Sequence, residues 1–146
     1  MKQVEEIIIR EISELDKIVK AVLSNSMDSR TILLEGEMGS GKTTVVSAFV
    51  KLLNSPEMVS SPTFSIINDY STSSIKIYHF DLYRLNSVKE LQEIGFEEYL
   101  DAENYCFIEW PKLAIPFLSD NYSSIKISLE ADGSRKFGLY KRNGII

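Results

Sequence analysis

The sequence predicts an α/β fold, in which helices flank a mixed parallel and antiparallel central sheet, in a single domain over residues 1–146. An apolar run at Thr31–Leu34 leads into a glycine-rich loop, and apolar residues at helical spacing follow that loop. A run without alternation suits a parallel strand covered on both faces. Two later segments are typical of antiparallel hairpins, so we expect a mixed sheet. A chain of 146 residues can bury one sizeable core.

The first half of the chain predicts two strands and two helices. Val4–Ile9 is rich in β-branched residues and predicts a short strand. Ser13 is the expected N-cap of the first helix, because its hydroxyl can accept a backbone N–H. That helix should pack one face on the core, since apolar residues recur at helical spacing. Thr31–Leu34 is the second strand, and a helix of about three turns should run from the glycine-rich loop to near Asn54.

The second half predicts two strand pairs around a helical region and one more buried strand. Ser87 is expected to cap a helix, with Glu90 three residues on, and Gly95 should end that helix. A short turn at Phe96–Leu100 follows. The expected strands are Thr63–Tyr70 paired with Ile75–Asp81, then Tyr105–Trp110, and finally Ser123–Leu129 paired with Arg135–Tyr140 about Asp132-Gly133-Ser134.

Composition argues against several classes of protein. The net charge of −5 and the pI near 5.0 disfavour a broad basic face that would grip nucleic acid, although a local basic patch stays possible. The one cysteine, Cys106, precludes an internal disulfide framework and a cysteine-based zinc site, and we expect it to be a small buried residue. We expect no signal peptide, no membrane span and a cytoplasmic location.

Residues 36–43 match the phosphate-binding pattern G-x-x-x-x-G-K-[ST], the P-loop. Glycines in this pattern let successive backbone N–H groups point into one concavity, and the following helix presents its N-terminus there. Lys42 would place its charge on the β- and γ-phosphates, and the Thr43 hydroxyl can bind Mg²⁺. The expected ATP-binding residues of the loop are Glu37, Met38, Gly39, Ser40, Gly41, Lys42, Thr43 and Thr44.

A P-loop enzyme also needs an acid to hold the metal or to position water, commonly at the end of a buried strand. Glu109 follows the apolar residues 105–108, and Asp81 closes Ile77–Asp81. Both are candidate catalytic residues beside Lys42, with Thr43 and Glu109 as metal ligands. A solvated acid at a strand end is the alternative for Glu109, and a turn cap is the alternative for Asp81.

Three further residues stay open at this point. His79 alternates with Asp81 and can share its face, but a lone histidine is more often structural than catalytic. Arg84 can place a charge on the γ-phosphate or form a structural pair with an acid. Trp110 can pack in a core or interface, or stack near the nucleotide.

In combination, these motifs resemble the TsaE family, formerly YjeE, the ATPase of bacterial tRNA threonylcarbamoyladenosine synthesis. The likeness spans about residues 10–140. Beyond the P-loop it rests on five short segments that occur in the family's order and spacing. These are Ser61-Pro62-Thr63-Phe64, Asn68-Asp69-Tyr70, Tyr78–Leu85, Glu93-Ile94-Gly95 and Ile108-Glu109-Trp110-Pro111.

The resemblance implies an enzyme that binds ATP with Mg²⁺, hydrolyses it slowly alone, and docks on the TsaB–TsaD pair. TsaD transfers the threonylcarbamoyl group to adenosine at tRNA position 37, so tRNA would be contacted only through the complex, and we expect a monomer when the chain is free. Thr63 would lie near the γ-phosphate, and Asp81 would be a switch-region acid. Ser13 is the candidate contact on the adenine side, where family members often carry a threonine. Arg135 falls where a basic residue near the nucleotide can lie.

Two alternative functions remain beside that of a TsaE-type ATPase. A small-molecule P-loop kinase usually brings several arginines over the phosphates from a lid, whereas only Arg84, Arg135 and Arg142 follow the P-loop helix here. A nucleotide-dependent binding module without useful hydrolysis would look the same as a slow ATPase when assayed alone.

Overall fold

The computed structural model describes residues 1–25, 29–62, 64–119 and 121–142. Its strands are β1 (Lys2–Ile9), β2 (Thr31–Glu35), β3 (Ile67–Asp69), β4 (Ile77–Asp81), β5 (Tyr105–Glu109), β6 (Ser123–Leu129) and β7 (Arg135–Lys141). Its helices are α1 (Leu15–Asn25), α2 (Lys42–Leu52) and α3 (Val88–Glu93), with 3₁₀ turns η1 (Ile12–Glu14), η2 (Phe96–Tyr99) and η3 (Pro111–Phe117).

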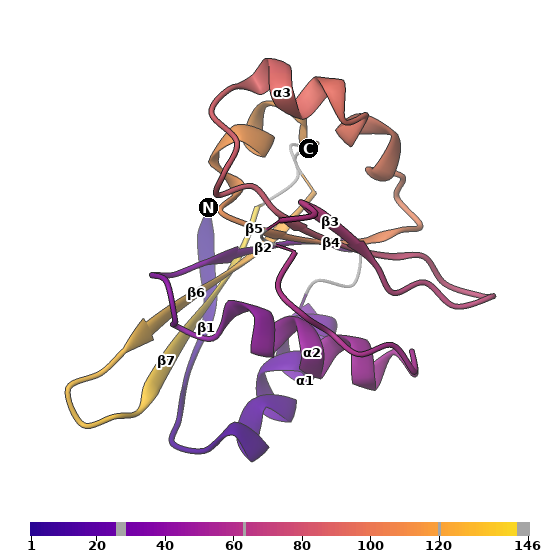
Figure 1. The fold of residues 1–146 in the computed structure, drawn as a ribbon. Coiled ribbons are helices and arrows are strands. Elements are labelled where there is room, and N and C mark those ends of the chain that lie inside the picture. The colour runs from indigo at the N-terminus through magenta and orange to yellow at the C-terminus, as the bar shows by residue number, and fades with distance from the viewer. Residues whose placement is uncertain (26–28, 63, 120, 143–146) are drawn as a thin grey trace.

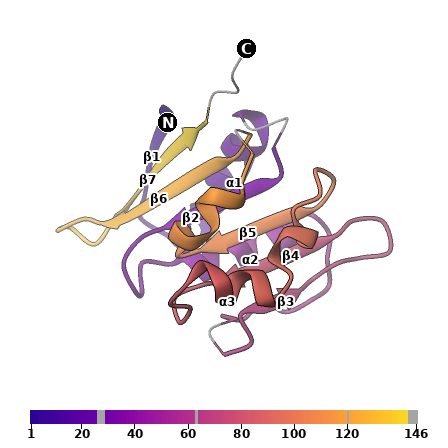
Figure 2. The ribbon, with the colours of Figure 1, turned by 90° about the horizontal axis from the view of Figure 1, so that it is seen from above.

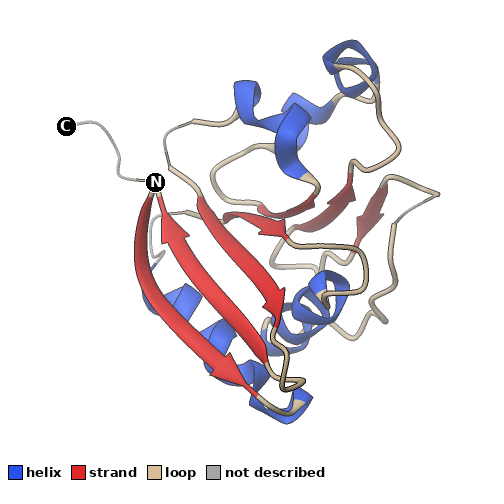
Figure 3. Cartoon of the chain, turned by 90° about the vertical axis from the view of Figure 1, so that its left-hand side faces the viewer, coloured by secondary structure: helices blue, strands red, loops and turns tan. Residues whose placement is uncertain are grey.

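All seven strands join one sheet in the order β1-β7-β6-β2-β5-β4-β3. The inner strands β6, β2, β5 and β4 run parallel, whereas β1, β7 and β3 pair antiparallel with their neighbours. The long strands β1, β7 and β6 lie side by side and twist away from the shorter strands (Figure 3). The predicted mixed sheet is therefore confirmed, with β2 in its interior as the apolar run indicated.

Helices cover both faces of the sheet. In Figure 1, α1 and α2 lie below the strands and α3 lies above them; Figure 2 looks down on the face that carries α3. The residues facing α1 and α2 form one core, which includes Leu34, Phe49 and Phe107. Those facing α3 form the other, which includes Leu33 and Phe96. Adjacent residues of β2 thus enter opposite cores, as the alternation of a strand requires.

Several local predictions are confirmed. The Ser87 hydroxyl accepts the Glu90 N–H at the start of α3, and Gly95 ends that helix at φ 74°. Cys106 is buried and its thiol donates to the carbonyl of Tyr99. Burial raises the pKa of this thiol to about 12, so Cys106 acts as a small structural residue.

Three predictions are wrong in detail. Ser13 does not cap a helix: it lies exposed within η1, and the Glu14 carboxylate accepts the N–H groups of Arg10 and Glu11 instead. The strand predicted at Thr63–Tyr70 shortens to β3, because the chain turns at Ile66 with φ 70°. The strand predicted at Tyr105–Trp110 ends at Glu109, since Trp110 adopts a left-handed conformation with φ 55°.

Phe49 of α2 packs against Phe107 of β5 with ring centroids 5.0 Å apart, and its side chain is fully buried. Phe49→Ala should lower the free energy of unfolding by about 3–5 kcal/mol, because it leaves a cavity between helix and sheet. Leu52→Ala on the same helix, at a side chain 40% exposed, should change it by less than about 1 kcal/mol. Urea denaturation followed by circular dichroism measures both; equal losses would contradict this packing.

Candidate nucleotide site

Strand register brings the glycine-rich loop and both candidate acids to one edge of the sheet. The parallel strands β2, β5 and β4 all end at this edge, where β2 passes into the loop. Glu109 is level with Leu34 on one side and with Asp81 on the other. Level residues on neighbouring strands face the same side. Asp81 and Glu109 therefore lie next to each other on the side of the sheet covered by α2.

The loop has the backbone that its glycines permit. Gly39 and Gly41 take φ values of 81° and 109°, and Gly41 is the residue from which α2 starts. The Ser40 N–H donates to the Glu37 carbonyl inside the loop. At Gly36, an added Cβ would stand 2.6 Å from Ser40 Oγ and 2.9 Å from the carbonyl oxygen of Ile127. A side chain there would push the loop away from the backbone of β6, so the close packing requires Gly36.

Lys42 lies in the concavity of the loop and is nearly buried. Its Nζ donates to the carbonyl of Gly36 at 2.6 Å and lies 3.5 Å from the ring centroid of Trp110. Burial lowers the pKa of Lys42, while the nearby charges of Glu109 and Asp81 oppose that shift. The ammonium is thus partly dehydrated, which strengthens its attraction for an anion that enters the loop.

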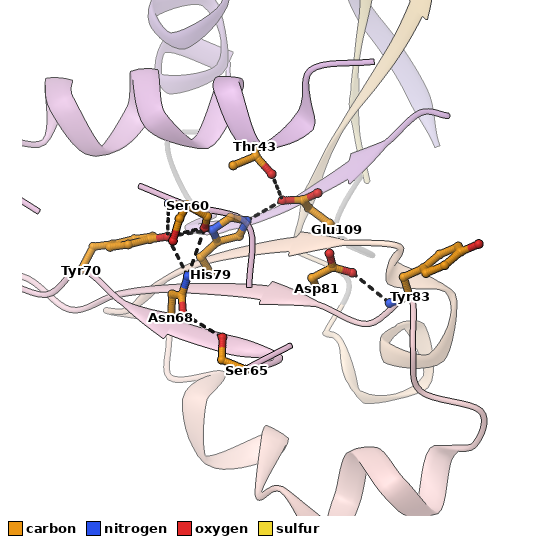
Figure 4. Close-up of polar contacts among 9 residues, drawn as sticks. All are labelled: Thr43, Ser60, Ser65, Asn68, Tyr70, His79, Asp81, Tyr83 and Glu109. Carbon is orange, nitrogen blue, oxygen red and sulfur yellow. Dashed lines mark hydrogen bonds and ion pairs between the residues drawn. The ribbon is translucent and has the colours of Figure 1, made fainter. Parts of the chain in front are cut away.

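Glu109 is held by contacts from two different elements. Its Oε2 accepts the Thr43 hydroxyl at 2.9 Å and lies 2.6 Å from Nε2 of His79 (Figure 4). All three side chains meet beneath the first turn of α2, and Glu109 is only 3% exposed. The carboxylate therefore has a fixed position rather than that of a solvated strand-end acid.

Asp81 lies beside Glu109 and is also nearly buried. Its Oδ1 accepts the N–H of Tyr83, the turn-capping contact that was the alternative at this position. Asp81 thus makes the turn-capping contact and also lines the pocket formed by the glycine-rich loop and Glu109.

These groups line a pocket of about 310 Å³. Of the residues predicted for the site, the pocket wall contains Met38, Gly39, Gly41, Lys42, Thr43, Thr44, Asp81, Glu109 and Arg135. Glu37 and Ser40 line an adjoining pocket with Gly36 and Trp110. Thr63 lies outside the described residues.

The donor set of the pocket fits phosphate groups and a hard divalent cation. Among the described residues, no three His, Cys, Asp or Glu side chains converge to form a complete metal site. Mg²⁺ commonly takes only one or two carboxylates and completes its shell with phosphate oxygens and water. The Ser40 Oγ, which is buried without a hydrogen-bond partner, leaves one polar group in the loop to be satisfied.

Of the two nucleotide contacts predicted outside the loop, Arg135 lies at the loop and Ser13 does not. Arg135 lies at the loop, where its Nε donates to the Ser40 carbonyl at 3.0 Å. Ser13 is exposed and is absent from the small neighbouring pocket that Ile12, Leu15, Thr44 and Arg135 help to line. Ile12 and Leu15 thus line a pocket together with Gly41 and Thr44 of the loop, whereas Ser13 does not.

The sequence left Trp110 and Arg84 open, and it gave Tyr70 no role in the site beyond its place in the family-like segment Asn68-Asp69-Tyr70. Trp110 covers Lys42 and contacts Tyr83, so it lies at the pocket and not in a core. The Arg84 guanidinium lies 5.0 Å from the ring centroid of Phe64. Tyr70 is buried and its hydroxyl contacts Nδ1 of His79. The segment Asn68-Asp69-Tyr70 marks this tyrosine as family-like, but no local pattern predicts its contact with His79.

Comparisons with known proteins show the family of this chain. The family model described as "Threonylcarbamoyl adenosine biosynthesis protein TsaE" matches residues 9–137. The TsaE protein of Bacillus subtilis is 32% identical over 123 residues, covering 84% of this chain and 77% of that protein. The TsaE protein of Rickettsia prowazekii is 30% identical over 131 residues, covering 89% of this chain and 90% of that protein.

A solved structure shows the same architecture. The crystal structure of YdiB from Bacillus subtilis superimposes with a TM-score of 0.77 and 26% identity, covering 97% of this chain and 87% of that one. No helix in the described part of the chain is long and apolar enough to cross a membrane. Sequence and fold together place this chain in the TsaE family of tRNA threonylcarbamoyladenosine biosynthesis proteins.

Proposed function

We propose that this chain is a Mg²⁺-dependent ATPase that supports the TsaB–TsaD pair in forming threonylcarbamoyladenosine at position 37 of tRNA. One observation carries the enzymatic part: Lys42, Thr43, Asp81 and Glu109 line a single pocket, with Thr43 hydrogen-bonded to Glu109. The family membership carries the pathway part. The ATP would serve to drive repeated turnover of the partner complex and not to phosphorylate a metabolite.

The proposed reaction is the attack of water on the γ-phosphorus of ATP. A bond forms from the water oxygen to phosphorus, the bond to the β–γ bridging oxygen breaks, and ADP and phosphate leave. Lys42 and the loop N–H groups would hold the β- and γ-phosphate oxygens. Mg²⁺, when bound, neutralises phosphate charge; Thr43 and Glu109 are the residues that would hold it. Asp81 would orient the attacking water by accepting its hydrogen bond.

Arg135 and Trp110 have supporting roles in this proposal. Arg135 would keep its contact with the Ser40 carbonyl and add positive charge at the loop. Trp110 would cover Lys42 and limit its access to water. ADP would occupy the same loop contacts after hydrolysis. Both sequence relatives described above are TsaE proteins by name, so the kinase alternative gains no support from them.

Lys42→Ala should reduce kcat/KM for ATP by about 10²–10³-fold, because it removes a preorganised charge at the phosphates. Glu109→Ala should lower kcat by a similar factor and weaken ATP binding much less, because its role lies with metal and water. Lys51→Ala, an exposed lysine at the end of the same helix α2, is the matched control and should hydrolyse ATP normally. Phosphate release and calorimetric titration measure both parameters. Wild-type hydrolysis by Glu109→Ala would refute its assigned role.

The pathway is tested by reconstituting tRNA modification with the TsaB and TsaD proteins of the same organism. Wild-type chain with ATP should permit several rounds of threonylcarbamoyladenosine formation per complex, whereas Lys42→Ala should permit about one round or fewer. Mass spectrometry of digested tRNA counts the product. Equal product with and without the wild-type chain would contradict the assignment. Phosphorylation of an added metabolite would favour the kinase alternative.

A further inference from the structure

A buried series of polar contacts leads from Glu109 away from the pocket. Nε2 of His79 lies 2.6 Å from Oε2 of Glu109, and Nδ1 of the same ring lies 3.2 Å from the Tyr70 hydroxyl. The Tyr70 hydroxyl in turn donates to the Ser60 carbonyl at 3.0 Å and accepts the Ser60 N–H at 3.3 Å. Figure 4 shows the series running from Thr43 through Glu109 and His79 to Ser60.

The His79 ring is fixed at both nitrogens. The side chain is fully buried, so water cannot replace a lost partner. Turning the ring over would place carbon atoms where Glu109 and Tyr70 now meet nitrogen, and would leave two buried polar groups unpaired. The orientation of His79 therefore depends on Glu109 and on Tyr70 together.

The far end of the series reaches the wall of the pocket again. Ser60 precedes Ser61, which lines the pocket with Lys42 and Glu109. The Asn68 side-chain amide also donates to the Ser60 carbonyl at 3.1 Å and to the Tyr70 hydroxyl at 3.2 Å. Tyr70 and Asn68 thus hold the backbone at Ser60 from β3 and the residue after it. The two positioned rings thus form a continuous polar connection from Glu109 to this backbone.

We propose that His79 and Tyr70 are positioning residues that couple the Glu109 carboxylate to the backbone at Ser60 and Ser61. The coupling is reciprocal: a change at Glu109 loosens or tightens Ser60, and a change at Tyr70 alters how Glu109 serves the cation. The effect of Tyr70 on the cation rests on the proposed Mg²⁺–ATP function, whereas the effect of Glu109 on Ser60 does not. The series thereby connects the metal side of the site to a loop on its opposite wall.

The first experiment needs no nucleotide. Amide hydrogen exchange of Ser60 is measured by NMR in the wild type, Tyr70→Phe, Glu109→Ala and Tyr105→Phe. Tyr70→Phe should speed exchange by about tenfold, because it removes the acceptor of the Ser60 N–H. Glu109→Ala should speed it by about threefold or more, although Glu109 does not touch Ser60. Tyr105→Phe removes a hydroxyl from the opposite end of β5 and should change exchange less than about twofold.

The second experiment reads the other end of the series. Calorimetry gives the affinity for ADP with Mg²⁺ and with EDTA. Tyr70→Phe should reduce the gain in affinity due to Mg²⁺ by about threefold or more and leave the affinity in EDTA within about twofold. In a His79→Phe background, Tyr70→Phe should add less than about twofold, because the connection is already broken. A general loss of structure would instead lower both affinities, and urea denaturation verifies that each variant is folded.

An unchanged Ser60 exchange rate in folded Glu109→Ala would overturn the coupling. The coupling would also be overturned if Mg²⁺ raised the ADP affinity of Tyr70→Phe as much as that of the wild type. Additive effects of His79→Phe and Tyr70→Phe on this increase in affinity would overturn it too. A wild-type chain that binds no nucleotide would refute the proposed function, and the exchange experiment would then decide the coupling by itself.

Discussion

The site depends on one contact, between the Thr43 hydroxyl and the Glu109 carboxylate. Thr43 belongs to the first turn of α2, and Glu109 is the last residue of β5. Their contact therefore joins the helix that carries the glycine-rich loop to the central strand beside β2. The parallel register of β2, β5 and β4 makes this contact possible, because it aligns the three strand ends at one edge. Displacing β5 by one residue would turn Glu109 toward the opposite core.

The electrostatics of the site follow from the same arrangement. Two carboxylates and one ammonium lie together with less than a tenth of each residue exposed to solvent. The carboxylates offset part of the penalty that burial places on the charge of Lys42. The Trp110 ring lies against the Lys42 ammonium, and its backbone is left-handed, a conformation that is unusual for an aromatic residue. Such strain at the pocket is a common feature of functional sites.

Much of this arrangement could be predicted from the sequence, because several signals are local. The glycine pattern with Lys42 and Thr43 specifies a loop between strand and helix, and the apolar run before Glu109 specifies a buried strand that ends in an acid. Ser87 was predicted correctly as a cap for the same reason: its partner Glu90 is three residues away. The local pattern at Ser13 gave a wrong prediction, because the Glu14 carboxylate and not the Ser13 hydroxyl accepts backbone N–H groups here, those of Arg10 and Glu11.

The remainder depends on tertiary register, which the sequence does not show. The alternation of His79 with Asp81 placed both on one face, but the partner of His79 is a residue on another strand. Likewise, nothing local indicates that Tyr70 meets His79 and Ser60, or that Trp110 turns back over Lys42. The contacts of Tyr70 with His79 and Ser60 arise where β3, β4 and β5 lie side by side. They are also the contacts on which the coupling between the acid and the loop depends.

The central claim is that the loop, Thr43 and Glu109 form one site for Mg²⁺ and the phosphates of a nucleotide. A crystal structure of the chain with Mg²⁺ and a non-hydrolysable ATP analogue tests it most directly. We expect the cation about 2.0–2.1 Å from Thr43 Oγ1, with Glu109 bound to it directly or through one water. We also expect Lys42 Nζ to exchange the Gly36 carbonyl for the phosphates. A nucleotide whose phosphates lie outside the loop, or a cation held away from both Thr43 and Glu109, would contradict the account.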